Sequence, residues 1–305
     1  MSLLEEELNK IQIQTVRYDD NSVEQYDVMD GMKGFKVNVG NVGFIELVDC
    51  MPRLAPKGRT MEYRIVQAAR TSYGQGLKTV SEDIGLIRYL HRHKHTTPFE
   101  MIEFMFHVKL PIFVARQWIR HRTANVNEYS ARYSIVKEQF FRPSIDSLCS
   151  QSSTNKQGRS DELVDIGTAE EFLQYLDKAE SLYNDYMNMV NKGVSREIAR
   201  EGLPLTTMTE MYWKCDLHNI VRFLQLRMDS HAQKEIRDYA NAMFVIIRQF
   251  VPIVCGCMLK EIGSVTFNTD EIEAIKNGSY ILGDSNSSKR EQTEFIEKLE
   301  KLKIK

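Results

Sequence analysis

The segment from residue 100 to residue 122 constrains the fold most, because two different periods follow one another in it. From Glu100 to Leu110, large apolar residues alternate with mostly polar ones, and this period of two predicts a strand with His107 on its outward side. Pro111 then fits the first position of a helix, where its missing N–H group costs nothing. The sequence therefore predicts a strand that passes directly into a helix.

The predicted helix ends in a cluster of cations. Arg120, His121 and Arg122 follow its last apolar residue, Ile119, one turn after Arg116. Consecutive helical residues lie about 100° apart, so the three side chains cannot share one solvated face. One interpretation is that they complement the negative end of the helix dipole, at roughly 0.3–1 kcal/mol each. The other is that they bind an anion.

A polar run without glycine or proline follows the cations and favours the second interpretation. Six of its residues carry hydrogen-bonding or charged side chains: Asn125, Asn127, Glu128, Ser130, Arg132 and Tyr133. An arginine can grip a phosphate through two parallel hydrogen bonds. The stretch therefore predicts an anion site for a nucleotide.

Arg120-His121-Arg122, seven residues and then Ser130 resembles the RHR-x7-S signature of the flavin-dependent thymidylate synthases (the ThyX family). The flanking residues that also fit this family are Gln117, Glu128, Arg132 and Tyr133. Further stretches are similar to its A-R-x-S, H-x-T-P-F-E, R-E-x-A-R-x-x-L-P and L-R-x-D-x-H-A-Q-x-E-I blocks, at residues 69–72, 95–100, 196–204 and 226–236. Together the matches extend over roughly residues 42–262.

The resemblance implies a fold and an activity. The fold is α+β, a single domain with a mainly antiparallel sheet flanked by helices. The activity is the conversion of dUMP to dTMP, with methylenetetrahydrofolate as the carbon donor and NADPH as the reductant of a bound FAD. Members of the family are homotetramers whose active sites lie at subunit interfaces.

The resemblance also implies roles for individual residues. FAD is expected to contact Ser72, Thr97, Glu100, Arg120, His121, Arg122, His218, Arg222 and His231. dUMP is expected to contact Gln117, Glu128, Ser130, Ala131, Arg132, Arg200 and Arg227. In catalysis we expect Arg227 against the uracil carbonyl, His95 beside flavin and folate, and Ser130. Asp216, His218 and Arg222 depart from a common pattern of the family, so their contacts with FAD stay open.

Two other functions remain as alternatives. The first is a related enzyme on the same scaffold, such as a dUMP hydroxymethyltransferase, which product analysis would distinguish. The second is a nucleic-acid-binding protein, which a net charge of −2 and the lack of a basic stripe argue against. The sequence has neither a G-x-G-x-x-G fingerprint nor a P-loop, so FAD would be held by Arg, His, Ser and backbone groups.

Composition places the chain among ordinary globular proteins, with 42% hydrophobic and 27% charged residues. No apolar run approaches the roughly 20 residues of a membrane span, and the acidic N-terminus lacks a signal-peptide pattern. Five cysteines without a regular framework suggest a reducing compartment, so we expect a cytoplasmic protein. Successive histidines at 91, 93 and 95 lie two residues apart and no nearby carboxylate completes a ligand set, so they are expected to be basic residues at a helix end and no metal is expected.

The chain divides into an extension at residues 1–41, the main domain at 42–262 and a charged tail at 263–305 with an amphipathic helix. Residues 144–167 form a polar surface insertion. Two helix starts carry clear signals: Ser81 as a cap, and Thr168 with Glu171 as a capping box. Pro98 should force Thr97 into an extended conformation, so that helix changes to strand there.

The sequence predicts no nucleophile on the enzyme. A thiolate that attacks uracil would need an electropositive, accessible site. Cys215 lies nearest to a matched block, but no cation cluster is aimed at it by spacing. Ser130 is a poor nucleophile without a base, so it is expected only to hydrogen-bond dUMP.

Overall fold

The computed structural model describes residues 3–16, 34–53, 59–71, 79–153, 158–282 and 287–303. The chain divides into two compact units, Met1–Met258 and Leu259–Lys305. The described ranges contain no helix that is both long and apolar enough to cross a membrane.

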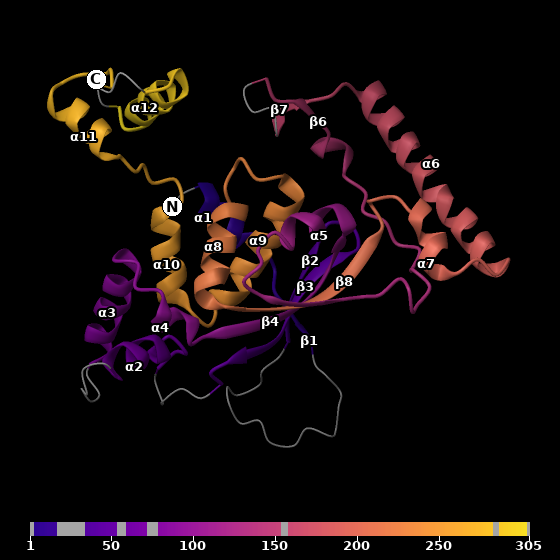
Figure 1. The fold of residues 1–305 in the computed structure, drawn as a ribbon, viewed down its shortest axis with the longest axis horizontal. Coiled ribbons are helices and arrows are strands. Elements are labelled where there is room, and N and C mark those ends of the chain that lie inside the picture. The colour runs from indigo at the N-terminus through magenta and orange to yellow at the C-terminus, as the bar shows by residue number, and fades with distance from the viewer. Residues whose placement is uncertain are drawn as a thin grey trace. The chain divides into compact units, whose positions relative to one another are not determined.

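A six-stranded antiparallel sheet organises the first unit, in agreement with the predicted α+β class (Figure 1). In spatial order its strands are β1 (Gln14–Val16), β2 (Gly34–Val39), β3 (Gly43–Met51), β4 (Glu103–Pro111), β8 (Met208–Asp216) and β5 (Asn125–Glu128). β4 is the predicted alternating strand, and it pairs with β3 and β8 on its two sides. Strands β1 and β2 come from the predicted N-terminal extension, so part of that segment belongs to the sheet.

Helices cover one face of this sheet, where Figure 1 shows α5, α8 and α9. The helices of the first unit are α1 (Leu3–Asn9), α2 (Tyr63–Thr71), α3 (Val80–Arg92), α4 (Thr97–Glu100), α5 (Ile112–Trp118), α6 (Ile166–Asn191), α7 (Arg196–Ala199), α8 (Leu217–Arg227) and α9 (Lys234–Ile247), with α10 (Pro252–Glu261) at its end. Short 3-10 turns occur at η1 (Ile145–Ser147) and η2 (Arg200–Gly202). A separate hairpin of β6 (Cys149–Gln151) and β7 (Arg159–Leu163) lies in the predicted insertion.

Aromatic rings fill the space between the sheet and the helices. Trp118 of α5, Trp213 of β8 and Phe223 of α8 are fully buried. The ring centroid of Trp118 lies 4.6 Å from that of Phe223 and 5.6 Å from that of Trp213. Burying such side chains dominates core energetics, so this contact fixes the end of α5 against α8. The position of the residues that follow α5 depends on it.

Two predicted boundaries near prolines are wrong in detail. Thr97 is not extended: it begins the short helix α4, and β4 starts only at Glu103. Pro98 lies in the first turn of α4, where a missing N–H group breaks no helical hydrogen bond. Pro111 is the N-cap of α5 and still belongs to β4, so α5 is shorter than predicted and ends before Arg120.

The two predicted helix caps are also displaced. α3 is capped by Thr79, which forms the capping box with Glu82, and not by Ser81. α6 is capped by Asp165, whose carboxylate accepts a hydrogen bond from the N–H group of Thr168 at 3.0 Å. An ionised carboxylate is a strong N-cap acceptor, which explains why the helix starts upstream of the predicted box.

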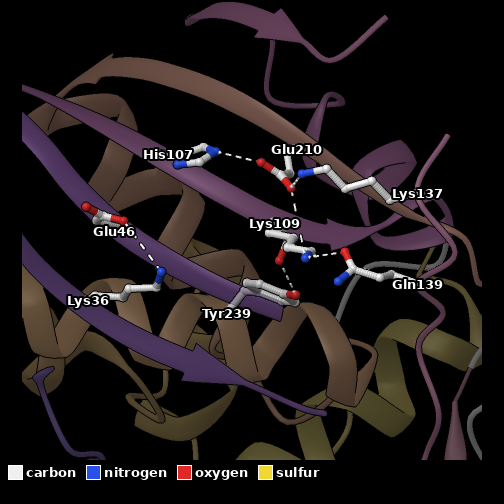
Figure 2. Close-up of polar contacts among 8 residues, drawn as sticks. All are labelled: Lys36, Glu46, His107, Lys109, Lys137, Gln139, Glu210 and Tyr239. Carbon is white, nitrogen blue, oxygen red and sulfur yellow. Dashed lines mark hydrogen bonds and ion pairs between the residues drawn. The ribbon is translucent and has the colours of Figure 1, made fainter. Parts of the chain in front are cut away.

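The polar face of the sheet carries a cluster of charged groups that are paired with one another (Figure 2). The carboxylate of Glu210 on β8 contacts His107 Nε2 and Lys137 Nζ, both at 3.2 Å, and lies 3.9 Å from Lys109 Nζ. Lys109 also donates a hydrogen bond to the side-chain oxygen of Gln139 at 2.5 Å. His107 is thus an outward strand residue, as predicted. We call these five residues the sheet cluster.

Helix α9 is fastened to the sheet beside this cluster. The hydroxyl of Tyr239 donates a hydrogen bond to the carbonyl oxygen of Lys109 at 2.6 Å (Figure 2). Gly43 lets this hydroxyl approach, because a Cβ atom at residue 43 would clash with it and would lie 2.7 Å from the carbonyl oxygen of Val39. A side chain at this position would therefore separate α9 from the edge of β3.

The second unit is a small helical hairpin with its own core. α11 (Thr269–Lys276) and α12 (Lys289–Lys301) bury Ala274, Leu282, Phe295 and Leu299. α12 is the predicted amphipathic helix, and Phe295 and Leu299 of its apolar stripe pack inside the unit. The carboxylate of Glu271, which is almost fully buried, accepts hydrogen bonds from Lys298 at 2.6 and 2.9 Å.

Candidate functional site

A cationic pocket lies between the end of α5 and the length of α8. Its volume is ≈ 470 Å³, and it is lined by Arg120, His121, Arg122, Thr123, Cys215, Asn219, Arg222, Leu226 and Arg227. Four guanidinium groups thus border one space, and among the described residues no carboxylate lines it. Because like charges at short range repel, an anionic ligand is favoured in this pocket.

The buried end of α5 directs the predicted Arg-His-Arg motif into this pocket. After Trp118 the chain turns, and the N–H group of His121 donates a hydrogen bond to the carbonyl oxygen of Trp118 at 3.0 Å. The His121 ring then packs edge-on against Phe223, with ring centroids 4.8 Å apart. Arg120 and Arg122 on either side are exposed. One residue of the motif therefore faces the core and two face the solvent.

Helix α8 supplies the other half of the pocket. It begins directly after β8, where the carboxylate of Asp216 accepts hydrogen bonds from Asn219, at 2.9 Å from the backbone N and 2.7 Å from Nδ2. Asp216 is thus a helix cap, one of the positions whose role the sequence left open. Arg222 lines the pocket, whereas His218 does not.

Arg227 and His121 form the centre of the pocket. Arg227 Nε donates a hydrogen bond to His121 Nε2 at 3.0 Å, and Arg227 Nη2 donates one to the carbonyl oxygen of Gln117 at 3.2 Å. Burial, and then the charges of Arg227 and Arg222, lower the pKa of His121 to about 4. The ring is therefore neutral near pH 7, accepts at Nε2 and carries its proton on Nδ1.

This arrangement suits a ligand with one or more phosphate groups. Arginine forks bind phosphate oxygens bidentately, and a neutral imidazole can donate one more hydrogen bond. Burial lowers the pKa of Arg227, so an anion would also relieve an unfavourable charge there. The residues present therefore fit the diphosphate of a dinucleotide cofactor.

A second group of predicted residues lies outside the cationic pocket, around the start of α7. Arg132 forms an ion pair with the carboxylate of Glu197 at 3.0 Å, and Arg200 Nε donates a hydrogen bond to the carbonyl oxygen of the same residue at 3.3 Å. Ser130 Oγ accepts a hydrogen bond from the N–H group of Arg132 at 3.3 Å. Arg196 donates a hydrogen bond to the carbonyl oxygen of Tyr133 at 2.7 Å. We call Ser130, Arg132, Arg196, Glu197 and Arg200 the Glu197 group.

Glu128 and Gln117 are held by separate contacts. Thr209 Oγ1 donates a hydrogen bond to the Glu128 carboxylate at 2.7 Å across β8 and β5. The Gln117 side chain donates a hydrogen bond to that of Gln233. Glu128, Ala131 and the Glu197 group do not line the cationic pocket. Within one chain, the residues expected to bind dUMP are therefore divided between two places.

The remaining predicted residues that the structure describes do not line the cationic pocket either. His95, Thr97 and Glu100 lie at the junction of α3 and α4, where His95 and Thr97 are exposed. His231 is also exposed, and its Nδ1 lies 2.8 Å from a carboxylate oxygen of Asp229. Ser72 lies outside the described residues. These positions remain predictions for the cofactor site.

Cys215 is a pocket residue that the sequence did not reveal. It lines the cationic pocket. Its spacing from the arginines in the sequence did not indicate this, because α5 and α8 come together only in the folded chain. Its thiol donates a hydrogen bond to the carbonyl oxygen of Thr123 at 3.2 Å. Burial, and then the charge of Asp216, raise the pKa of Cys215 far above its ordinary value. The thiol stays protonated, so the pocket does not activate it as a nucleophile.

The chain is similar to known proteins over most of its length. Residues 53–253 match the model of a family described as thymidylate synthase complementing protein (Thy1). A protein named flavin-dependent thymidylate synthase from Dictyostelium discoideum is 53% identical over 296 residues, which cover 97% of this chain and 95% of that protein. One of the same name from Treponema denticola is 52% identical over 270 residues, which cover 88% of this chain and 97% of that protein.

A solved structure is similar as well. It is the crystal structure of the UMP/dUMP methylase PolB from Streptomyces cacaoi bound with 5-Br UMP, with a TM-score of 0.64 and 27% sequence identity. The match covers 75% of this chain and 99% of that one.

Proposed function

This chain belongs to the family of flavin-dependent thymidylate synthases, and we propose that its cationic pocket binds the diphosphate of FAD. The enzyme methylates dUMP to dTMP and depends on a flavin. The observation that carries the proposal is the lining of the pocket, where four arginines meet without an acid among the described residues. A bound FAD supplies the electrons that reduce the transferred one-carbon unit. NADPH provides these electrons, and methylenetetrahydrofolate provides the carbon.

In this proposal, Arg120, Arg122 and Arg222 bind the phosphates, and the neutral His121 ring keeps Arg227 in place. The other FAD contacts come from Ser72, Thr97, Glu100, His218 and His231. His95 lies beside the flavin and the folate. Because several of these residues lie outside the cationic pocket, copies of the chain combine to complete each site.

The dUMP site divides in the same way. Arg132 and Arg200 bind the phosphate, with Glu128, Ser130, Ala131 and Gln117 as further ligands, and Arg227 lies against the uracil ring. A guanidinium group at the uracil carbonyl stabilises negative charge that develops on the ring during carbon transfer. The Glu197 group and Arg227 occupy different places in one chain, which supports a homotetramer with active sites at subunit interfaces.

No side chain of the enzyme attacks uracil. Burial, and then the charge of Asp49, raise the pKa of Cys50 to about 11, and burial raises the pKa values of Cys215 and Cys255 further. Three of the five thiols are thus poorly ionised at neutral pH, and Ser130 has no base among its recorded contacts. A variant with all five cysteines replaced should still form dTMP.

The protein is cytoplasmic, and its chain consists of a catalytic domain with added segments. The catalytic domain spans residues 42–262, with 144–167 as an insertion and 263–305 as a tail. Residues 1–41 are an extension whose strands β1 and β2 enlarge the sheet of this domain. All five cysteines are free, which suits the reducing conditions of the cytoplasm.

Product analysis with the purified protein tests the activity. With FAD, NADPH and methylenetetrahydrofolate, dUMP should be converted to dTMP. Accumulation of hydroxymethyl-dUMP would instead indicate a hydroxymethyltransferase. Because PolB is a UMP/dUMP methylase, UMP should be compared as a substrate. Failure to consume dUMP while RNA binds with a steep salt dependence would contradict the proposal.

Flavin affinity tests the pocket. Each charged hydrogen bond is worth about 1.5–3 kcal/mol, so Arg120→Ala combined with Arg122→Ala should weaken FAD binding at least roughly tenfold. Arg116→Ala is the matched control, because Arg116 is exposed on α5 and does not line the pocket. An unchanged flavin spectrum and affinity in the double variant would overturn this assignment.

A further inference from the structure

Helix α6 carries a face that is unused within the chain. α6 is 26 residues long, and Figure 1 shows it at the side of the sheet, apart from α8 and α9. Its inner face is fixed, because Leu176 and Tyr186 are buried and the Tyr183 hydroxyl donates a hydrogen bond to the carbonyl oxygen of Val136 at 2.8 Å. The orientation of the outer face follows from these contacts.

An apolar row and a charged row run side by side along this outer face. Tyr175, Leu182 and Met189 are 61%, 42% and 38% exposed and recur every seven residues, which is two helical turns. A second row, four residues earlier in each repeat, alternates in charge and consists of Glu171, Lys178, Asp185 and Lys192. No ion pair of these four side chains occurs with any described residue. A large exposed apolar row bordered by charges is typical of an interaction surface.

We infer that α6 pairs with α6 of a second copy of this chain, in antiparallel orientation about a two-fold axis at Leu182. Such an axis brings Leu182 against its symmetry mate and Tyr175 against Met189 of the second copy. It also brings Lys178 near Asp185 and Glu171 near Lys192, and each contact occurs twice by symmetry.

The charge order selects this arrangement. A parallel pairing in register would place every charge of the row beside its own copy, which is unfavourable. The antiparallel pairing instead places unlike charges opposite one another, Lys178 with Asp185 and Glu171 with Lys192. An isologous interface requires a surface that is complementary to itself, and the α6 rows have this property. The inference rests on the proposed homo-oligomer and names one of its faces.

Charge exchange tests the pairing through the mass of the assembly. Asp185→Lys should weaken self-association by about tenfold, since two symmetric pairs change from attraction to repulsion. Lys178→Glu combined with Asp185→Lys should restore it, because the pair is only reversed. Glu170→Lys, on another exposed side of α6, is the matched control. Sedimentation velocity over a dilution series measures the association.

A cross-link provides a second measurement that does not depend on a weakened variant. Leu182→Cys should form a disulfide-linked dimer under an added oxidant, whereas Glu170→Cys should not. The inference is overturned by a monomeric wild-type protein, by wild-type association in Asp185→Lys, or by a double variant that stays dissociated. dTMP formation is assayed on the same samples: loss of activity with intact assembly would count against the proposed function alone.

Discussion

Two groups of basic side chains in this chain differ in the acids that accompany them. In the sheet cluster, His107, Lys109 and Lys137 share the carboxylate of Glu210 (Figure 2). Burial alone would raise the pKa of Glu210, but the hydrogen bond and charge of Lys137, with the charges of Lys109 and His107, keep it below its ordinary value. In the cationic pocket, no described carboxylate lies among the arginines to pair with them.

The difference separates a structural group from a ligand-binding one. A cluster whose cations share a carboxylate of the chain stabilises the fold, and the loss of that carboxylate leaves a partly buried charge behind. The cations of the pocket share no described carboxylate, so they repel one another until an anion is bound. Substitutions in the sheet cluster should therefore lower the stability of the fold. Substitutions in the cationic pocket should lower ligand binding.

The largest effect is expected from Arg227→Ala. Removal of a donor that stabilises developing charge typically lowers kcat about 10²–10³-fold, and we expect a loss of this size in dTMP formation. Stability should change little, because the loss of the hydrogen bonds to His121 and Gln117 is offset by the removal of one of four mutually repelling cations. Activity assays and urea unfolding measure the two effects, and Arg116→Ala serves as the control. Retention of full activity would show that Arg227 does not act on uracil.

Arg227→Lys sharpens this prediction. Lysine keeps the charge but loses the planar fork. We expect weaker dUMP binding with an unchanged flavin spectrum, and the same outcome for Arg132→Lys. Loss of flavin with unaltered dUMP affinity would assign the arginine to the cofactor instead.

Glu210→Gln should lower the stability of the fold and leave ligand binding unchanged. Lys109 is only 9% exposed, and burial, partly offset by the charge of Glu210, lowers the pKa of Lys109. Without the carboxylate this lysine stays buried beside a neutral amide, so the free energy of unfolding should fall by about 1–3 kcal/mol. Urea unfolding measures the change, with the exposed Glu197→Gln as the control. Unaltered stability would mean that the sheet cluster is not structural.

Acid should destabilise the chain through His121. Its pKa is about 4 in the folded chain against an ordinary 6.5, so between these values the unfolded chain binds a proton that the folded chain does not. This contribution to stability is fully present above pH 6.5 and is lost as the pH falls toward 4. In His121→Gln the free energy of unfolding should therefore depend less on pH in this window. His231→Gln is the control, and equal pH profiles for wild type and His121→Gln would contradict the prediction.

The sequence predicted best where one period dominates a segment. The alternation in β4 and the helical period after Pro111 identified both elements, and the resemblance placed Arg120 to Arg122 at a site. β5 was missed because all four of its residues are exposed, so no apolar alternation marks it and only its pairing with β8 makes it a strand. Cys215 and Asn219 were missed as pocket residues because they lie far from Arg120, His121 and Arg122 in the sequence. Only the packing of Trp118 against Phe223 brings the two segments together.

The smallest effect is expected at the Glu197 group, which is paired like the sheet cluster but exposed like the outer arginines of the pocket. The side chains of Arg132 and Glu197 are 54% and 58% exposed. Exposed ion pairs contribute about 0.2–1 kcal/mol, so Glu197→Gln should barely change the free energy of unfolding. If Arg132 binds the phosphate of dUMP, Glu197 competes with that phosphate, and its neutralisation should lower the KM for dUMP.

The size of this decrease follows from the solvent around the pair. Two unit charges about 4 Å apart interact by roughly 1 kcal/mol in water, which limits the change in KM to about fivefold. The effect should shrink as salt is added, because exposed charges are screened. Glu201→Gln, at an exposed acid in η2, is the matched control. A KM that rises in Glu197→Gln would show that Glu197 holds Arg132 in its binding position, and the pair would then be structural, like the sheet cluster.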